Sequence, residues 1–294
     1  MKHGSLEKNS CKDYAGIMVL ADRNNLFKAG IIYSSLSVVF IIAASFVVLP
    51  VYSFFDTDLV QRSAAGFLQI ILNRGLNPSF YAVHVSISAL AVYSLAVLCF
   101  IFYFFEKTQS PEILFIALFI ASLACESLRL FLPLQQVFAI PSFYLLITSR
   151  LLLFGRCFGL CSLFAAGIYA VGLEIQKQRN VIGIAAIASF IIALGTPIDT
   201  FTWETSFNAI SGYAHVFRMI NGGILLITVI SFLIAAYLRG SREYIFIGVG
   251  VFLAFAGRSI LLHADSWAGL PGIIPLSFGA WFICKYLHKV YLWL

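Results

Sequence analysis

The residues of this sequence that could do chemistry are charged side chains inside apolar segments. Residues 113–133 form an apolar run about long enough to span a bilayer as a helix, yet the run contains Glu126 and Arg129. Side chains three residues apart on a helix lie on one face, so the two can form an ion pair. A charge in hydrocarbon costs roughly 2.5–3.5 kcal/mol on insertion scales, so such groups normally face protein or water. The pair therefore predicts a polar site inside the membrane.

Four further arginines lie inside apolar segments, at Arg150, Arg156, Arg218 and Arg258. A guanidinium group stays protonated, so five arginines opposite one carboxylate leave an excess of positive charge. Backbone carbonyls, water, acidic residues in loops or a bound anion must neutralise that excess. A bound anion would be an anionic small molecule or a lipid headgroup. The alternative is a structural network in which Glu126 bridges two arginines.

The spacing of polar residues favours a lined cavity. Asn208, Ser211, His215, Arg218 and Gly222 follow steps of three and four residues, as in one stripe of a helix. Histidines at the same depth would tune ligand binding or make it sensitive to pH. We therefore predict a ligand-binding pocket in the outer half of the membrane. Its predicted residues are Glu126, Arg129, Arg150, Arg218, Arg258, His84, His215 and His263.

Arg156 is assigned to a different role. It lies between Gly155 and Gly159, and this G-x-x-x-G pattern is typical of membrane helices that pack closely together. We therefore expect Arg156 to serve a contact between helices.

The elements that position these residues are predicted to be membrane-spanning helices. Hydrophobic residues make up 61% of the chain and charged residues 11%, with a mean hydropathy of +0.95, whereas soluble domains are about 25% charged. The predicted fold class is all-α: a polytopic helical membrane protein with one lead-in span and a seven-helix core. The eight predicted transmembrane helices are residues 29–53, 80–105, 113–133, 142–173, 181–198, 207–238, 244–264 and 272–292.

The distribution of Lys and Arg predicts the orientation of this bundle. With eight spans, 12 of the 19 Lys and Arg residues fall on one side, two on the other and five within the membrane. Because cytoplasmic loops carry the excess of positive charge, both termini are predicted to be cytoplasmic, in the cytoplasmic (inner) membrane. Residues 1–28 are predicted to form a cytoplasmic tail and residues 29–292 a single bundle. The longest external loop, 54–79, is expected to contain a short interfacial helix.

Several classes of function lack a signal in the sequence. No motif for nucleic acid is visible, so nucleic acid is not expected as a partner. No G-x-S-x-G, H-E-x-x-H or P-loop motif occurs. Cys157 and Cys161 lie one helical turn apart, but further ligands are not evident, so no metal or other cofactor is predicted.

A short segment carries a partial likeness to a known family. Residues 124–129, ACESLR, resemble the A-C-x-x-x-R segment of exosortase and archaeosortase membrane transpeptidases. The resemblance covers six residues and implies Cys125 as a nucleophile, assisted by a later arginine and a histidine, for which Arg258 and His263 are the candidates. The chain departs from that family in having Glu126 directly after the cysteine and in the long separation of the later residues.

The predicted function is binding of an anion from the outer side of the membrane. The layout of one lead-in span and seven helices is similar to membrane sensor domains, so the lipid bilayer and a separate cytoplasmic effector protein are the expected partners. One alternative is a small anion transporter or channel, which would need a polar path on the cytoplasmic side as well. Another is an intramembrane enzyme that acts on a lipid or lipid-linked substrate through Cys125.

Overall fold

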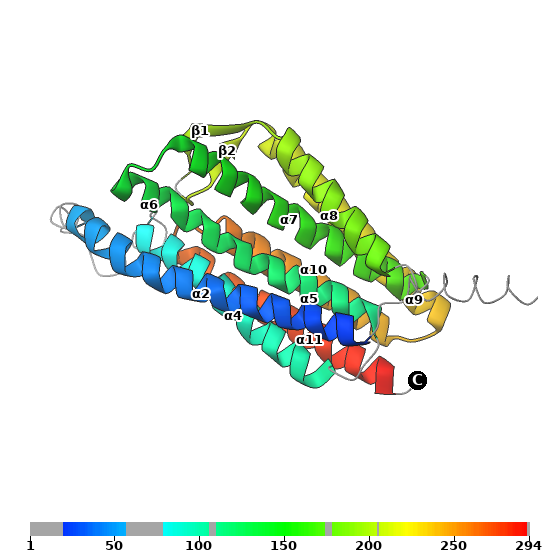
Figure 1. Cartoon of the computed structure of the whole chain (residues 1–294). Coiled ribbons are helices and arrows are strands. Elements are labelled where there is room, and N and C mark those ends of the chain that lie inside the picture. Colours follow the sequence, from blue (N-terminus) through cyan, green and yellow to red (C-terminus); the bar gives the residue numbers. More distant parts are fainter. Residues whose placement is uncertain (1–19, 57–78, 106–109, 174–177, 205, 293–294) are drawn as a thin grey trace, which may run out of the picture.

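The chain folds into a helical bundle with one short β-hairpin (Figure 1). The computed structural model describes residues 20–56, 79–105, 110–173, 178–204 and 206–292. In chain order the elements are α2 (Leu20–Asp56), α4 (Phe80–Phe105), α5 (Pro111–Leu123), the 3-10 helix η3 (Ala124–Leu130), α6 (Phe131–Phe138), α7 (Ser142–Val171), α8 (Gln178–Gly195), β1 (Ile198–Trp203), β2 (Ala209–Ser211), α9 (Ala214–Arg239), α10 (Glu243–Leu262), the 3-10 helix η5 (Trp267–Gly272) and α11 (Ile273–Leu292).

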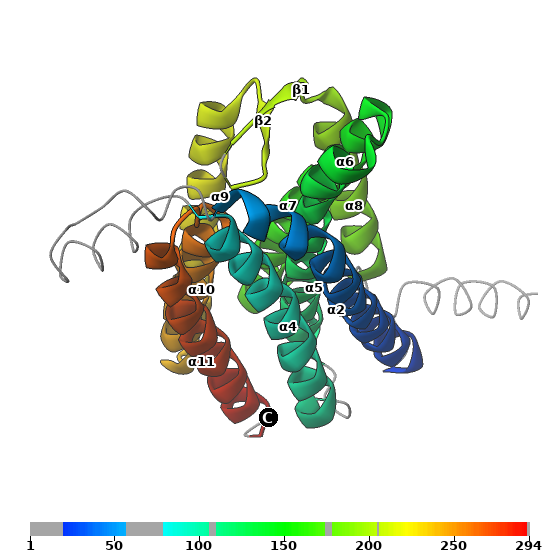
Figure 2. The ribbon, with the colours of Figure 1, turned by 90° about the vertical axis from the view of Figure 1, so that its left-hand side faces the viewer.

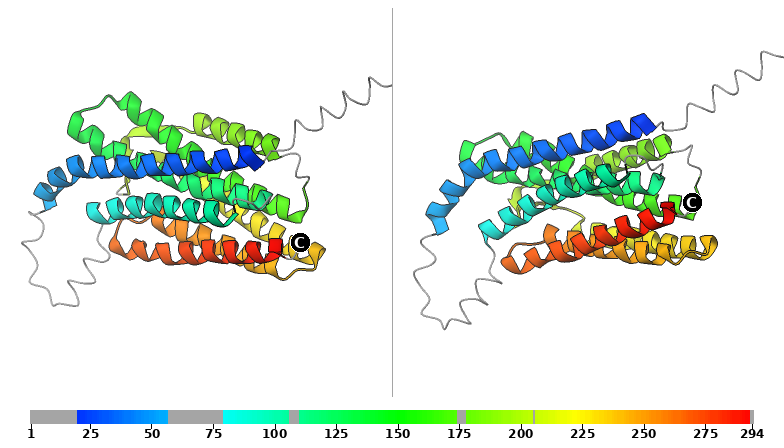
Figure 3. Two further views of the ribbon diagram at one scale, coloured as in Figure 1. Left: turned by 60° about the horizontal axis from the view of Figure 1, so that its bottom comes forward. Right: turned by 90° about the horizontal axis from the view of Figure 1, so that it is seen from below.

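Eight helical segments among the described residues are long and apolar enough to cross a membrane. The prediction of a polytopic helical membrane protein with eight spans is therefore confirmed. The start of α2 and the end of α11 lie at the same end of the bundle, as an even number of crossings requires (Figures 1 and 3). The first span differs from its predicted bounds, because α2 begins at Leu20 and not at residue 29.

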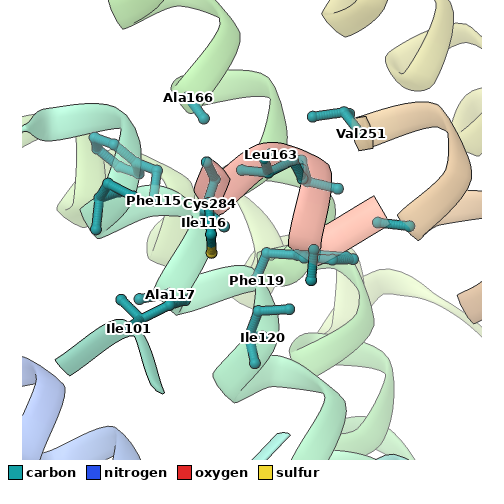
Figure 4. Close-up of a cluster of buried hydrophobic side chains, with 14 of the residues drawn as sticks. Ile101, Phe115, Ile116, Ala117, Phe119, Ile120, Leu163, Ala166, Val251 and Cys284 are labelled. Atoms are coloured by element: carbon teal, nitrogen blue, oxygen red, sulfur yellow. The ribbon is translucent and has the colours of Figure 1, made fainter. Parts of the chain in front are cut away.

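The centre of the bundle is the third span, formed by α5, η3 and α6. It is the most deeply buried of the eight, with 78% of its most apolar window inside the protein. Apolar side chains from α5 interlock with those of α7, α10 and α11 in the main core (Figure 4). The labelled residues include Phe115, Phe119, Leu163 and Val251. The helices that surround this core are much more exposed, as expected for surfaces that face lipid.

The third span is not a regular α-helix along its whole length. Residues 124–130 form the 3-10 helix η3, in which side chains three residues apart eclipse one another. This geometry places Glu126 and Arg129 on the same side, and an Nη1 of Arg129 lies 3.7 Å from a carboxylate oxygen of Glu126. The predicted ion pair is therefore confirmed.

The predicted helical stripe in the sixth span is wrong. Ala209–Ser211 is a β-strand that pairs antiparallel with Ile198–Trp203, and α9 begins only at Ala214. Asn208 and Ser211 therefore do not share a helix face with His215 and Arg218. β1 is rich in β-branched and aromatic residues, which favour strands, and the hairpin bridges the ends of α8 and α9 (Figure 2).

The interfacial helix expected within 54–79 lies almost wholly outside the described residues.

At the opposite end of the bundle, a second carboxylate is buried. Glu112, near the start of α5, accepts hydrogen bonds from Ser110 at 2.9 Å and from Tyr291 of α11 at 2.5 Å. This contact fixes the last turns of α11 against the central span.

Glycines allow α10 and α11 to pack backbone to backbone. A Cβ atom at Gly279 would lie 2.5 Å from the Ala254 nitrogen and 2.6 Å from the Gly250 oxygen. Such contacts are too short for any side chain, and a helix backbone cannot move aside as a flexible side chain can. Gly183 of α8, by contrast, has nothing within 4 Å of the position of a Cβ.

We expect Gly279→Ala to destabilise the folded protein by about 1–3 kcal/mol, the usual cost of overpacking. The matched change Gly183→Ala should be neutral or slightly stabilising, because alanine is the better helix former. Melting temperatures of the two variants in the same detergent measure this difference. Equal melting temperatures would contradict the close packing of α10 on α11.

Candidate functional site

The carboxylate of Glu126 lies at the centre of a buried polar cluster. Its side chain is 1% exposed. Arg156 of α7 donates two hydrogen bonds to it, from Nε to Oε1 at 2.8 Å and from Nη2 to Oε2 at 2.7 Å. This two-point geometry is the strong form of an arginine–carboxylate pair. Together with the contact to Arg129, one acid therefore serves two arginines.

Two glycines bring Arg156 to this acid. A Cβ atom at Gly155 would lie 2.5 Å from Cys125 Sγ, and one at Gly159 would lie 3.0 Å from Ser122 Cβ. The close packing predicted from the G-x-x-x-G pattern is therefore confirmed. Because α7 approaches the third span so closely, Arg156 does more than form a helix contact. It is the main partner of Glu126.

The same arginines hold the β-hairpin against the bundle. Arg129 donates a hydrogen bond from Nη2 to the Ser206 carbonyl oxygen, and Arg156 donates one from Nη2 to Asn208 Oδ1 at 2.7 Å. Asn208 in turn donates from Nδ2 to Ser206 Oγ at 2.8 Å. Between them Phe207 has a positive φ of 59°, an uncommon conformation for a residue of this size. Its ring packs against Phe80, with ring centroids 5.2 Å apart.

Arg258 of α10 is buried and has no acidic partner within 4.0 Å among the described residues. It is 3% exposed, and its Nη2 donates one hydrogen bond to the Arg156 carbonyl oxygen at 3.3 Å. Its guanidinium carbon lies 5.7 Å from the centre of the Phe119 ring. Within the described residues, its buried Nε has no hydrogen-bond partner. Such a donor normally finds an acceptor.

A cavity of about 150 Å³ opens beside these groups, between α7, α9, α10 and the hairpin. Its polar lining comprises Arg156, Glu204, Asn208, Arg218, Asn221, Arg258, Ser259 and His263. Its apolar lining comprises Leu153, Cys157, Leu160, Ala209, Phe217, Phe255 and Leu262. A small cavity with apolar walls and several converging polar groups is the usual form of a ligand site.

α9 leans away from the bundle at the cavity. From His215 to Ile227 none of its described side chains is buried, and Thr228 is the first that is. Further along, α9 touches α7 tightly, because a Cβ at Gly167 would lie 3.2 Å from Ser231 Cβ. Arg218 and His263 are consequently exposed at the mouth of the cavity, and Arg258 is buried at its inner side.

The eight predicted site residues are only partly brought together. Arg218, Arg258 and His263 line the cavity, and Glu126 lies behind it, bonded to Arg156. The remaining four residues, Arg129, Arg150, His84 and His215, are not part of its lining. His84 instead forms a 2.8 Å hydrogen bond with Ser45 of α2.

The predicted site residues left out Arg156, Asn208 and Glu204, although Asn208 was expected in the polar stripe of the cavity. The glycines on both sides of Arg156 were an available signal. They indicate a close contact between two helices, and an arginine buried in such a contact needs an acidic partner there. Asn208 and Glu204 depend on the hairpin, which the sequence pattern did not reveal.

Cys125, which the resemblance to transpeptidases would make a nucleophile, lies outside the cavity lining. Tyr33 of α2 donates a hydrogen bond to its sulfur at 3.1 Å. Within the described residues no cluster of histidine, cysteine and acidic side chains could hold a metal ion.

Comparison with known proteins adds one partial match. A protein of Treponema pallidum (strain Nichols), described as an uncharacterized protein, is 31% identical over 96 residues. The match covers 33% of this chain and 28% of that protein, so the chain spans less than a third of its relative's length. No family model and no solved structure matches the chain.

We expect the Glu126–Arg156 pair to be strongly coupled. Replacing either residue alone by glutamine should destabilise the protein by about 3–5 kcal/mol, because a charge is left in the interior without its partner. The double variant should cost much less than the sum of the two. Unfolding free energies of the four proteins complete this cycle.

The exposed pair Glu243–Lys289, with a nitrogen–oxygen distance of 3.0 Å, provides the matched control. Its cycle should show almost no coupling, because water screens the charges. Additive costs at both pairs would refute the central role of Glu126.

Proposed function

We propose that this multi-pass membrane protein binds an anionic group in the cavity between α7, α9 and α10. The observation that carries the proposal is Arg258, a buried arginine in the lining of the cavity. Arg156 is largely neutralised by Glu126, whereas Arg218 and Arg258 have no acidic partner within 4.0 Å among the described residues. These two arginines would contact the ligand directly.

The ligand class is an anionic small molecule or a lipid headgroup. His263 stands at the mouth of the cavity, where Nδ1 lies 2.9 Å from the Ser259 carbonyl oxygen. If Nδ1 carries the proton, that contact is a hydrogen bond and Nε2 faces outward as an acceptor. Protonation of His263 would then add a donor and a positive charge at the mouth, so His263 is the residue expected to tune anion binding.

The packing below the cavity favours binding over transport. Between the cavity and the opposite end, the described core consists of apolar side chains, among them Phe119, Leu163 and Val251 (Figure 4). An ion that left the cavity in this direction would lose its polar contacts at a cost of many kcal/mol. The alternative of an anion channel therefore lacks the second half of its path.

The orientation of the bundle completes the proposal. We infer from the distribution of Lys and Arg that both termini are cytoplasmic. The hairpin and the cavity then face the outer side of the cytoplasmic membrane, where the ligand would arrive. A sensor of this form would pass its signal to a separate protein bound at the basic cytoplasmic loops.

One observation favours a second candidate, an intramembrane enzyme that acts on a lipid-linked substrate. The hydrogen bond from Tyr33 holds the Cys125 sulfur in a fixed position within the third span. In this alternative Cys125→Ser abolishes turnover in a protein that stays folded and still binds anions.

The orientation predicts the behaviour of reporter fusions. Green fluorescent protein fused after Leu294 should fluoresce, and alkaline phosphatase fused there should be inactive, since the enzyme needs export to form its disulfides. An alkaline phosphatase fusion within residues 205–207 should be active. The reverse pattern would place the cavity on the cytoplasmic side.

The cavity predicts that anions stabilise the protein through Arg258. Phosphate or sulfate should raise the melting temperature of the purified wild type above its value in chloride at equal ionic strength. At a ligand concentration of 100 Kd, binding should add about 2.7 kcal/mol to the free energy of unfolding. Arg258→Gln should lose this increment, because the buried donor is gone.

Arg150→Gln is the matched control, because it also removes an intramembrane arginine but lies outside the cavity. It and Cys125→Ser should keep the full anion response. A wild type that responds to none of these anions, or an Arg258→Gln variant that responds as the wild type does, would overturn the proposal.

A further inference from the structure

We propose that the cavity takes one dianionic, tetrahedral oxyanion group, as in a phosphate monoester. This inference rests on the proposed function, because it specifies which anion the same site accepts. Two sources could supply that chemistry, a free phosphate or the terminal phosphate of a membrane lipid.

The charges in and beside the cavity do not balance. Four guanidinium groups and two carboxylates meet there: Arg129, Arg156, Arg218, Arg258, Glu126 and Glu204. Two positive charges therefore remain when His263 is neutral. Arg258 is buried and Arg218 is exposed at the mouth, and neither has an acidic partner among the described residues. A dianion seated between them would match both charges, whereas a carboxylate or a phosphodiester would match one.

The volume of the cavity limits the size of the group. An engineered cavity of about 150 Å³ in another protein is filled by benzene, which has six heavy atoms. A phosphate group has five, so it fits a cavity of about 150 Å³ together with its ester carbon. A diphosphate or a sugar ring with its substituents would be too large to enter completely.

The donors surround the cavity on several sides. Arg258 and Ser259 come from α10, and Arg218 and Asn221 come from α9. A tetrahedral oxyanion presents acceptor oxygens in all of these directions, whereas a planar carboxylate presents two oxygens in one plane. The geometry of the donors thus favours the same ligand as the charge does.

The remaining walls would accommodate the substituent of the monoester. Phe217, Phe255 and Leu262 line the cavity and are partly exposed. An apolar chain attached to the phosphate would lie against them, and α9 leaves this side open because its first turns are not buried.

The test compares methyl phosphate with sulfate by calorimetry, on the full-length protein in detergent. Methyl phosphate is a dianion at pH 7.5 but mostly a monoanion at pH 5.0, since the second pKa of a phosphate monoester is about 6. Sulfate remains a dianion throughout. The other titratable groups that line the cavity, Cys157, Glu204 and His263, would act on both ligands alike, as would the arginines.

We expect the ratio of the methyl phosphate affinity to the sulfate affinity to fall about tenfold between pH 7.5 and pH 5.0, in line with the loss of the dianion. Arg258→Gln should abolish binding of both anions, and Arg150→Gln should preserve it. A ratio that does not change with pH would overturn the requirement for two charges.

Competing ligands separate failure of this inference from failure of the proposed function. Acetate or diphosphate that binds as tightly as methyl phosphate would refute the dianion inference and leave anion binding intact. If none of these anions binds, both the dianion inference and the proposed anion-binding function are refuted. Preference for phosphatidic acid over phosphatidylglycerol in nanodiscs would assign the site to a lipid monoester, and tight binding of inorganic phosphate alone would assign it to the free anion.

Discussion

The buried carboxylate of Glu126 is the constraint on which the structure depends. It accepts two hydrogen bonds from Arg156 and lies next to Arg129, so it joins the central span to α7. The same arginines reach Ser206 and Asn208 and thereby fix the hairpin. Without this acid, two guanidinium groups would be desolvated without compensation, which costs several kcal/mol for each ion. Helix packing at this end of the bundle is therefore organised by charge, whereas the main core is apolar and the second buried carboxylate, Glu112, lies at the opposite end.

This use of the acid leaves Arg258 without a carboxylate of its own. Glu126 bridges Arg156 and Arg129, as the alternative of a structural network expects, and this network does not include Arg258. Arg258 is left with one long hydrogen bond and the face of an aromatic ring. Arg258 and Arg218, which lack an acidic partner among the described residues, both line one cavity, whereas Arg150 lies outside it. These two arginines are the physical basis of the proposed anion site.

The eight spans were predictable because length and hydropathy determine them almost alone. The Glu126–Arg129 pair was also predictable, since a separation of three residues places both on one side of a helix. The main partner of Glu126 was not, because the choice between Arg150 and Arg156 depends on how closely α7 approaches the third span. The hairpin was missed for a related reason. The polar residues around Asn208 have the spacing typical of a helix, and only the tertiary contacts of the loop between β1 and β2 favour a strand.

The position of Glu126 along the chain has a consequence for biogenesis. During synthesis the third and fourth spans reach the membrane as consecutive segments, and Arg156 follows the acid by only 30 residues. Their charges can neutralise each other while both helices are still leaving the translocon, which lowers the cost of inserting either one. Arg258 emerges about a hundred residues later, after the acid has been occupied. The order of translation thus favours the same pairing that the folded structure shows.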